Sequence, residues 1–96
     1  MYLKIHKTGP QEVVALCDEE LIGKTLEENK FQLKISERFY KGEELSEDKI
    51  INILKSMGNL NIVGDKSVEL ALKIGIISEE DIIKIKGVPH VQVISF

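Results

Sequence analysis

The sequence predicts an α+β domain: a mostly antiparallel sheet of about five strands with two main helices packed on one face. Three observations support this fold class. Segments 3–6 and 31–36 alternate apolar and polar residues, which is typical of half-buried strands. Segments 46–57 and 65–75 place apolar residues along one stripe of a helix. No linker or repeat divides the chain, so we expect residues 1–96 to form a single compact domain.

The N-terminal part of the chain is predicted to form a hairpin followed by a helical turn. Residues 2–7 alternate apolar and polar side chains, and residues 13–17 form a continuous apolar run typical of a central strand. Turn-forming residues at 8–11 separate the two segments, so we expect them to pair as a hairpin. Asp18 is then expected to cap a short helical turn over 19–22.

The middle of the chain is predicted to contain a strand, a loop and a helix. The clearest period-two alternation lies at 31–36 and indicates a strand with one polar face. The charged and aromatic stretch 37–45 is expected to be a loop on the surface. Ser46 is predicted to cap a helix that buries an apolar stripe and ends at Gly58.

A strand, a glycine and a helix are predicted in succession over residues 59–75. The run 60–63 is rich in β-branched and aliphatic residues, and Gly64 ends it. Asp65 is expected to accept from the free N–H groups of a helix that runs to Gly75. This geometry also binds anions at the start of the helix.

The C-terminal part is predicted to contain one more helical turn and two strands. Ser78 and Asp81 have the spacing of a capping box. Segment 83–86 alternates isoleucine and lysine like a strand, residues 87–90 interrupt it, and residues 91–94 are expected to form a closing strand.

The charge and composition of the chain limit its partners. Thirteen Lys and Arg residues stand against 16 Asp and Glu residues, which gives a formal net charge of −3. A broad nucleic-acid surface, which needs clustered positive charge, is therefore not expected, although a small basic patch is compatible with this balance. A Lys- and Glu-rich chain with a branched aliphatic core resembles thermophile composition. The sequence has no apolar run long enough to span a bilayer and no signal-peptide pattern, so we expect a cytoplasmic protein without a membrane partner.

Metal binding and covalent catalysis have no signature in the sequence. His6, His90 and Cys17 are the strongest candidate ligands for a transition metal, but their spacing matches no metal motif. Cys17 ends an apolar strand, where a cysteine is usually a small buried residue rather than a nucleophile. We therefore assign no metal site and no catalytic residue, and the sequence leaves any cofactor unknown.

Two polar segments could hold an anion. Arg38 lies beside two aromatic residues, so its guanidinium can bind a phosphate or carboxylate while the rings stack on a base. The alternative is a surface pair of Glu37 and Arg38 with Phe39 buried. Gly64 and Lys66 can present an N–H group and an ammonium to a phosphate, although the nearby carboxylate competes for the same donors and favours helix capping alone.

The polar, rigid stretch from Gly87 to Gln92 is the best site candidate. Pro89 restrains the backbone and can hold His90 in a cleft. His90 and Gln92 are two residues apart, so both point to the same face if they lie in a strand, where they can read one ligand edge together. The alternative is that both lie on the solvated face of an edge strand.

Three stretches of the chain form a specific set. They are Glu37-Arg38-Phe39-Tyr40 with Gly42, Asn61-Ile62-Val63-Gly64 with a helix to Gly75, and Gly87-Val88-Pro89-His90 with Gln92. Together they resemble a known archaeal family, domain-of-unknown-function family 424. The resemblance covers nearly the whole chain, and one departure from it is Val91, where alanine is expected. It implies an archaeal origin and a single compact domain, and it assigns no catalytic role.

We predict a non-catalytic binding module for an anionic ligand, an RNA end or a protein partner. The alternative is a small enzyme with His90 as general acid or base in a pocket near residues 87–90, with Cys17 or a carboxylate nearby. Self-association through an open edge or face of the sheet is compatible with either function. The binding hypothesis involves Arg38, Tyr40, Asn61, Gly64, Lys66, Gly87, Pro89, His90 and Gln92.

Overall fold

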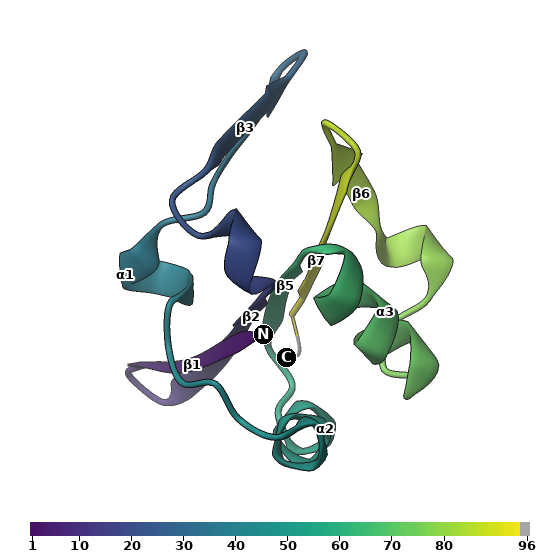
Figure 1. Cartoon of the computed structure of the whole chain (residues 1–96). Helices are drawn as coiled ribbons and strands as arrows, with labels where there is room; N and C mark the ends of the chain where they lie inside the picture. Colours follow the sequence, from purple (N-terminus) through teal and green to yellow (C-terminus); the bar gives the residue numbers. More distant parts are fainter. Residues whose placement is uncertain (95–96) are drawn as a thin grey trace.

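The fold is a mixed α+β arrangement around a five-stranded sheet, seen in a computed structural model that describes residues 1–94. The last two residues of the predicted 1–96 domain therefore lie outside the described range. Three of the four strand pairings are antiparallel and one, β2 with β5, is parallel, so the predicted mostly antiparallel sheet is confirmed. The strands follow one another across the sheet in the order β1 (Tyr2–Thr8), β2 (Gln11–Cys17), β5 (Leu60–Val63), β7 (Val88–Val93) and β6 (Ile83–Ile85) (Figure 1).

Helices and a second, two-stranded sheet fill the connections between these strands. The small sheet is a hairpin that extends away from the main sheet (Figure 1). No helix of the described chain is both long and apolar enough to cross a membrane. The additional elements are the 3₁₀ turns η1 (Glu19–Leu21) and η2 (Glu79–Asp81), the strands β3 (Thr25–Glu28) and β4 (Phe31–Lys34), and the helices α1 (Glu37–Tyr40), α2 (Glu47–Ser56) and α3 (Asp65–Lys73).

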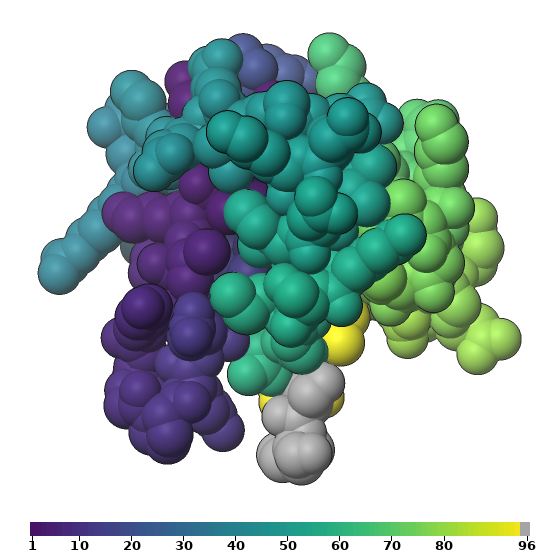
Figure 2. Space-filling view, turned by 90° about the horizontal axis from the view of Figure 1, so that it is seen from below, coloured from purple at the N-terminus to yellow at the C-terminus, as the bar shows by residue number. Residues whose placement is uncertain are grey.

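The larger hydrophobic core lies on one face of the main sheet. Leu16, Ile62 and Val91 are paired in register across β2, β5 and β7, and each is buried. They share a cluster with buried residues of α2 and α3. Figure 2 shows α2 (teal) lying between the β1–β2 hairpin and the segment that contains α3.

The opposite face of the sheet is apolar at one place and polar at another. Side chains alternate between the two faces of a strand, so Cys17 and Val63 point away from the larger core. Both belong to a second cluster that includes Ile35 and Tyr40, which lie outside the main sheet. The same face carries Asn61 on β5, and this polar part is where the site described below lies.

The hairpin and several helix ends agree with the predictions from sequence. β1 and β2 pair antiparallel over their full length. The Ser46 hydroxyl accepts from the backbone N–H of Lys49 at the start of α2. Ser78 and Asp81 form the predicted capping box at η2.

The predicted surface loop over 37–45 was wrong at its first turn, because residues 37–40 form α1. The Ser36 hydroxyl accepts from the backbone N–H of Phe39 and so caps this turn. Tyr40 at its end is only 2% exposed. A buried aromatic anchor and a serine cap thus stabilise a helix that is too short to show an apolar period.

The strand predicted at 31–36 exists as β4, but its partner is β3 and not the main sheet. The partner was missed because segment 25–28 contains one apolar residue among polar ones. The two strands are joined by a tight turn in which Asn29 takes a φ of 55°, a conformation that asparagine tolerates better than most residues.

The predicted interruption over 87–90 was also wrong, since β7 begins at Val88. The turn between β6 and β7 consists of Lys86 and Gly87, with φ values of 54° and 78°. Two successive positive φ values suit a tight hairpin turn, so the following proline can start a strand directly.

Candidate functional site

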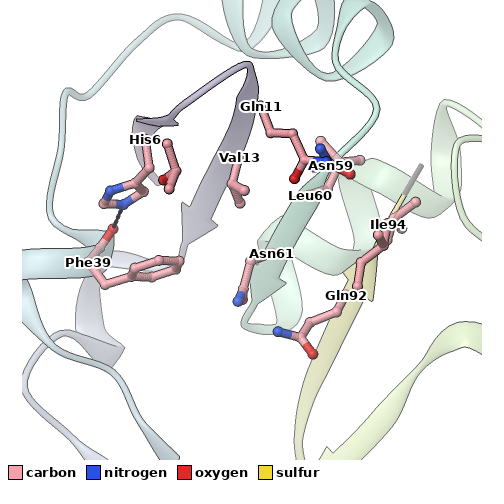
Figure 3. Close-up of a pocket in the computed structure, with 11 residues that line it drawn as sticks. His6, Gln11, Val13, Phe39, Asn59, Leu60, Asn61, Gln92 and Ile94 are labelled. Atoms are coloured by element: carbon pink, nitrogen blue, oxygen red, sulfur yellow. Dashed lines mark hydrogen bonds between the residues drawn. The ribbon is translucent and has the colours of Figure 1, made fainter. Parts of the chain in front are cut away.

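An open cavity of about 380 Å³ lies at the start of the short strand β5, which is flanked there by the start of β2 and the end of β7. We call it the β5 cavity. Figure 3 shows His6 and Phe39 on one side of it, and Asn61 with Gln92 on the other. None of its described lining residues is Lys, Arg, Asp or Glu. It is lined by His6, Thr8, Gln11, Val13, Phe39, Asn59, Leu60, Asn61, Gln92, Val93 and Ile94.

Asn61 is held in place by two residues on the same face of the sheet. The Tyr40 hydroxyl donates to Asn61 Oδ1 over 2.7 Å. His90 Nε2 lies 3.0 Å from the same oxygen. Asn61 is also paired in register with Gln92 on β7, so their side chains point to the same face. The arrangement places two amide groups next to each other, one fixed and one exposed.

Burial sets the protonation state of the two residues that hold Asn61. The pKa of Tyr40 is raised to about 12, chiefly by burial and further by Cys17, while the hydrogen bond with Asn61 opposes the shift. The pKa of His90 is lowered from its ordinary value, again because burial disfavours the charged form. Near neutral pH, therefore, the Tyr40 hydroxyl keeps its proton and the His90 ring is uncharged.

The other wall of the β5 cavity is aromatic. The rings of His6 and Phe39 are stacked, with centroids 4.4 Å apart and planes inclined by 12°. His6 Nε2 lies 2.7 Å from the Phe39 carbonyl oxygen, which fixes the imidazole against α1. Phe39 also meets Tyr40 edge to face at 4.8 Å, so the wall and the support of Asn61 belong to one packed unit.

Arg38 lies outside this unit. It is exposed on α1, and Lys4 Nζ donates to its backbone carbonyl oxygen over 2.6 Å. The alternative pair of Arg38 with Glu37 is not an ion pair in the described residues 1–94, and the binding role of the guanidinium stays a prediction. Phe39, predicted to be buried in that alternative, is half-buried and lines the cavity.

The backbone N–H groups at the start of α3 donate to the carboxylate of Asp18, which directly follows β2. Asp18 accepts from the Lys66 backbone N–H over 2.9 Å, from the Ser67 N–H over 2.8 Å and from the Ser67 hydroxyl over 2.6 Å. It is only 2% exposed. The predicted caps were therefore wrong: Asp18 does not cap η1 through its side chain, and Asp65 does not cap α3.

This arrangement follows from the close approach of two strand ends. Gly64 stands against Asp18, so closely that a Cβ atom there would lie 2.3 Å from the carboxyl carbon. Its N–H donates to the Pro89 carbonyl oxygen over 3.0 Å. The N–H groups predicted to receive a phosphate at Gly64 and Lys66 thus already have protein partners.

The candidate residues from the sequence divide into three groups. Asn61 and Gln92 line the β5 cavity, and Tyr40 and His90 support Asn61 from outside it. The remaining candidates lie elsewhere: Arg38 on α1, Gly64 and Lys66 at the start of α3, exposed Gly87 in the hairpin turn and buried Pro89 in β7.

Sequence reasoning missed the aromatic wall. His6 was considered only as a metal ligand, and the rings beside Arg38 were expected to stack on a base, but their contact with His6 was not predicted. Their contact joins residues 33 positions apart, for which the local pattern gives no signal. The amide Asn59, two residues before Asn61, was an available hint because alternate residues of a strand share a face.

Cys17 and His90 do not form a nucleophile and base pair in the described part of the chain. The pKa of the Cys17 thiol is raised to about 12, first by burial and then by the charges of Asp18 and Glu20, and the thiol donates to the Asp18 carbonyl oxygen. In the sheet, Val63 stands between Cys17 and His90. The described residues also contain no cluster of three His, Cys, Asp or Glu side chains able to hold a metal.

Comparison with known proteins gives a consistent picture of relatedness. Residues 6–96 match the model of a family described as a protein of unknown function, DUF424. The chain is also similar to a crystal structure of an uncharacterised conserved protein from Methanopyrus kandleri, with 33% identity and a TM-score of 0.78. That alignment covers 99% of this chain and 93% of the other. Among curated proteins, none matches.

Proposed function

We propose, on the premise that this chain belongs to the DUF424 family of proteins of unknown function, that it is a non-catalytic binding module. Its ligand would place a small, neutral, planar group in the β5 cavity. One observation carries this proposal: the described lining combines exposed amides with an aromatic wall and contains no Lys, Arg, Asp or Glu.

The lining favours a neutral group over the anion that the sequence suggested. An anion removed from water needs a compensating charge or several donors, and the cavity offers no lysine or arginine for this purpose. An amide and an aromatic wall suit a ring that stacks and carries polar edges. A charged part of the same ligand would lie outside the cavity, and exposed Arg38, next to Phe39 in the chain, is a candidate partner for it.

The position of the cavity supports ligand access. We infer that α2 and α3 cover one face of the main sheet together, because their buried residues share a cluster with the same strand positions. The cavity then opens on the other face, which α1 and the η1 turn cover only in part. A pocket of about 380 Å³ lies within the range of about 300–1,000 Å³ typical of small-molecule sites.

Other aspects of the proposal rest on the sequence. A single buried cysteine without a possible internal disulfide supports a reducing, cytoplasmic location. An RNA end or a protein segment is compatible with the cavity if it carries the planar group. Self-association through the sheet edge remains a separate proposal.

Binding is tested by calorimetric titration with a panel of small probes. We would titrate the protein with neutral planar rings (nucleosides, free nucleobases, and benzamide as a ring that is not a nucleobase), with acetamide, and with phosphate and acetate as anions. The expected result is saturable binding of at least one neutral ring compound and none of the anions. Gln92→Ala should weaken that binding about tenfold, since one desolvated hydrogen bond is lost.

Gln32→Ala is the matched control, because Gln32 is an exposed glutamine on β4 in the other sheet. It should bind as the wild type does. Binding only of the anions, or equal loss of affinity in both variants, would contradict the proposed site.

A further inference from the structure

We infer that the β5 cavity takes a nucleobase, and that the side-chain amide of Asn61 donates a hydrogen bond to an acceptor on the edge of that base. This inference rests on the proposed binding function and gives its ligand a chemical class. The orientation of the Asn61 side-chain amide determines which of its groups can bind a ligand.

The Tyr40 hydroxyl fixes which atom of Asn61 faces it. Tyr40 is 2% exposed, and a buried hydroxyl has to donate its proton to an acceptor. The bond to Asn61 over 2.7 Å is the only one that its hydroxyl makes with the described residues. Asn61 must therefore turn its carbonyl oxygen, and not its NH₂ group, towards Tyr40.

The same oxygen, Asn61 Oδ1, determines which ring nitrogen of His90 carries a hydrogen. An acceptor oxygen bonds only to a donor, so His90 Nε2, 3.0 Å away, has to carry a hydrogen. Tyr40 and His90 thus donate to Asn61 Oδ1 from two sides. Turning the amide over would leave the buried Tyr40 hydroxyl without an acceptor for its proton, whatever the tautomer of the His90 ring.

The NH₂ group of Asn61 is then left for a ligand. No residue of the described chain accepts from Asn61 Nδ2, and no buried polar side-chain atom in residues 1–94 lacks a partner, so this group reaches solvent. Asn61 lines the cavity, and Gln92 lies beside it on the neighbouring strand β7 (Figure 3). Asn61 therefore supplies donors only, whereas the exposed Gln92 amide can turn to donate or accept.

A nucleobase matches these groups. Every base presents an acceptor beside a donor on one edge, which suits a fixed amide donor next to an adjustable amide. The face of the ring can stack on the aromatic wall of Phe39 and His6, as bases do on exposed aromatic side chains. Carboxylates and phosphates lack such a face.

The base can come from a free nucleoside or from the end of a single-stranded RNA, and both share the same ring and edge. The test titrates the four ribonucleosides, and a hexaribonucleotide of the base that binds best, into the wild type and three variants. Asn61→Asp replaces the donor NH₂ with an acceptor oxygen. Asn52→Asp makes the same charge change on the exposed side of α2 and serves as control. Tyr40→Phe removes the hydroxyl that orients Asn61 without removing any group that contacts the ligand.

We expect at least one nucleoside to bind the wild type and the Asn52→Asp variant equally. Asn61→Asp should weaken binding more than tenfold, and Tyr40→Phe several-fold. Tyr40→Phe keeps the ring and the buried surface, so it remains informative if Asn61→Asp fails to give the wild-type amide NMR spectrum. Affinity for the hexaribonucleotide equal to that for its nucleoside identifies a free nucleoside as the ligand, and higher affinity identifies RNA.

Different results overturn the donor role of Asn61, the nucleobase as ligand, and the proposed binding function. If Asn61→Asp and Tyr40→Phe bind nucleosides like the wild type while Gln92→Ala does not, the donor role of Asn61 is overturned and the cavity stands. If no nucleoside or free nucleobase binds but benzamide does, the nucleobase is overturned and the neutral-ring site stands. If none of the neutral rings binds, the proposed function itself is overturned.

Discussion

Asp18 joins two strand ends to a helix through a single buried carboxylate. Asp18 directly follows β2, and its carboxylate accepts three hydrogen bonds from Lys66 and Ser67 at the start of α3. A carboxylate at a helix N-terminus is stabilised by the helix dipole as well as by the bonds themselves. The sequence pattern identified the helix and its start, but it could not identify a cap supplied from 48 residues away in the chain.

Gly64→Ala should destabilise the protein strongly, because the site combines two penalties. Gly64 has a φ of 112°, and a Cβ atom would lie within 2.3 Å of the Asp18 carboxyl carbon. We expect the free energy of unfolding to fall by more than about 2 kcal/mol in urea denaturation. Gly23→Ala is the control, since Gly23 also has a positive φ but no atom within 4 Å of the added Cβ.

The control should lose about 1–2 kcal/mol from backbone strain alone, so the larger loss expected for Gly64→Ala reports the added clash with Asp18. Equal losses in the two variants would mean that Asp18 moves aside freely, contrary to its role as a fixed cap.

His90 should make the stability of the protein depend on pH. Its pKa in the folded state lies below the ordinary value of 6.5, so the unfolded chain takes up the proton first as the pH falls. The stability contributed by neutral His90 is therefore complete above pH 6.5 and is lost as the pH drops through the folded pKa. Urea denaturation of the wild type and of His90→Gln at pH 7.5 and 5.5 measures this contribution.

The wild type should lose more stability between these two pH values than His90→Gln, which cannot take up a proton there. A difference of zero, or one of the opposite sign, would show that burial does not disfavour the charged imidazole.

At the scale of elements, prediction from sequence succeeded where the pattern was long and the caps were local. Helix α2 combines an apolar stripe with a serine at its start, and both signals lie within one segment. The short helix α1 was missed because distant contacts stabilise it, and the short strand β3 was missed because it contains only one apolar residue. Tyr40 stabilises α1 through burial and a hydrogen bond to β5, 21 residues away.

Ser46→Ala should destabilise α2 by about 1 kcal/mol, as expected for loss of an N-cap. The Ser46 hydroxyl accepts from the Lys49 backbone N–H, which would lose its partner. Ser56→Ala near the other end of α2 is the matched control: its exposed hydroxyl donates to the Ile53 carbonyl oxygen, and we expect a change within about 0.5 kcal/mol. Denaturation curves of the two variants that overlap would contradict the capping role.

At the scale of the whole molecule, the sheet order and the site depend on contacts that no local pattern contains. The parallel pairing of β2 with β5 joins segments that lie more than 40 residues apart. It brings the polar position Asn61 beside the β1–β2 hairpin, where Phe39 and His6 form the aromatic wall. Pattern reasoning identified Asn61, His90 and Gln92 as residues of interest, but only the fold shows which of them share a cavity.

The central claim is that Asn61 presents its NH₂ group to a ligand in the β5 cavity. The most direct measurement is a ¹H–¹⁵N spectrum of the protein during titration with the nucleoside that binds best, followed at the side-chain amide signals of Asn61 and Gln92. The account predicts that both signals shift with the same saturation curve, while the Asn52 side-chain signal stays in place. Saturable binding that leaves the Asn61 side-chain signal unchanged would contradict it.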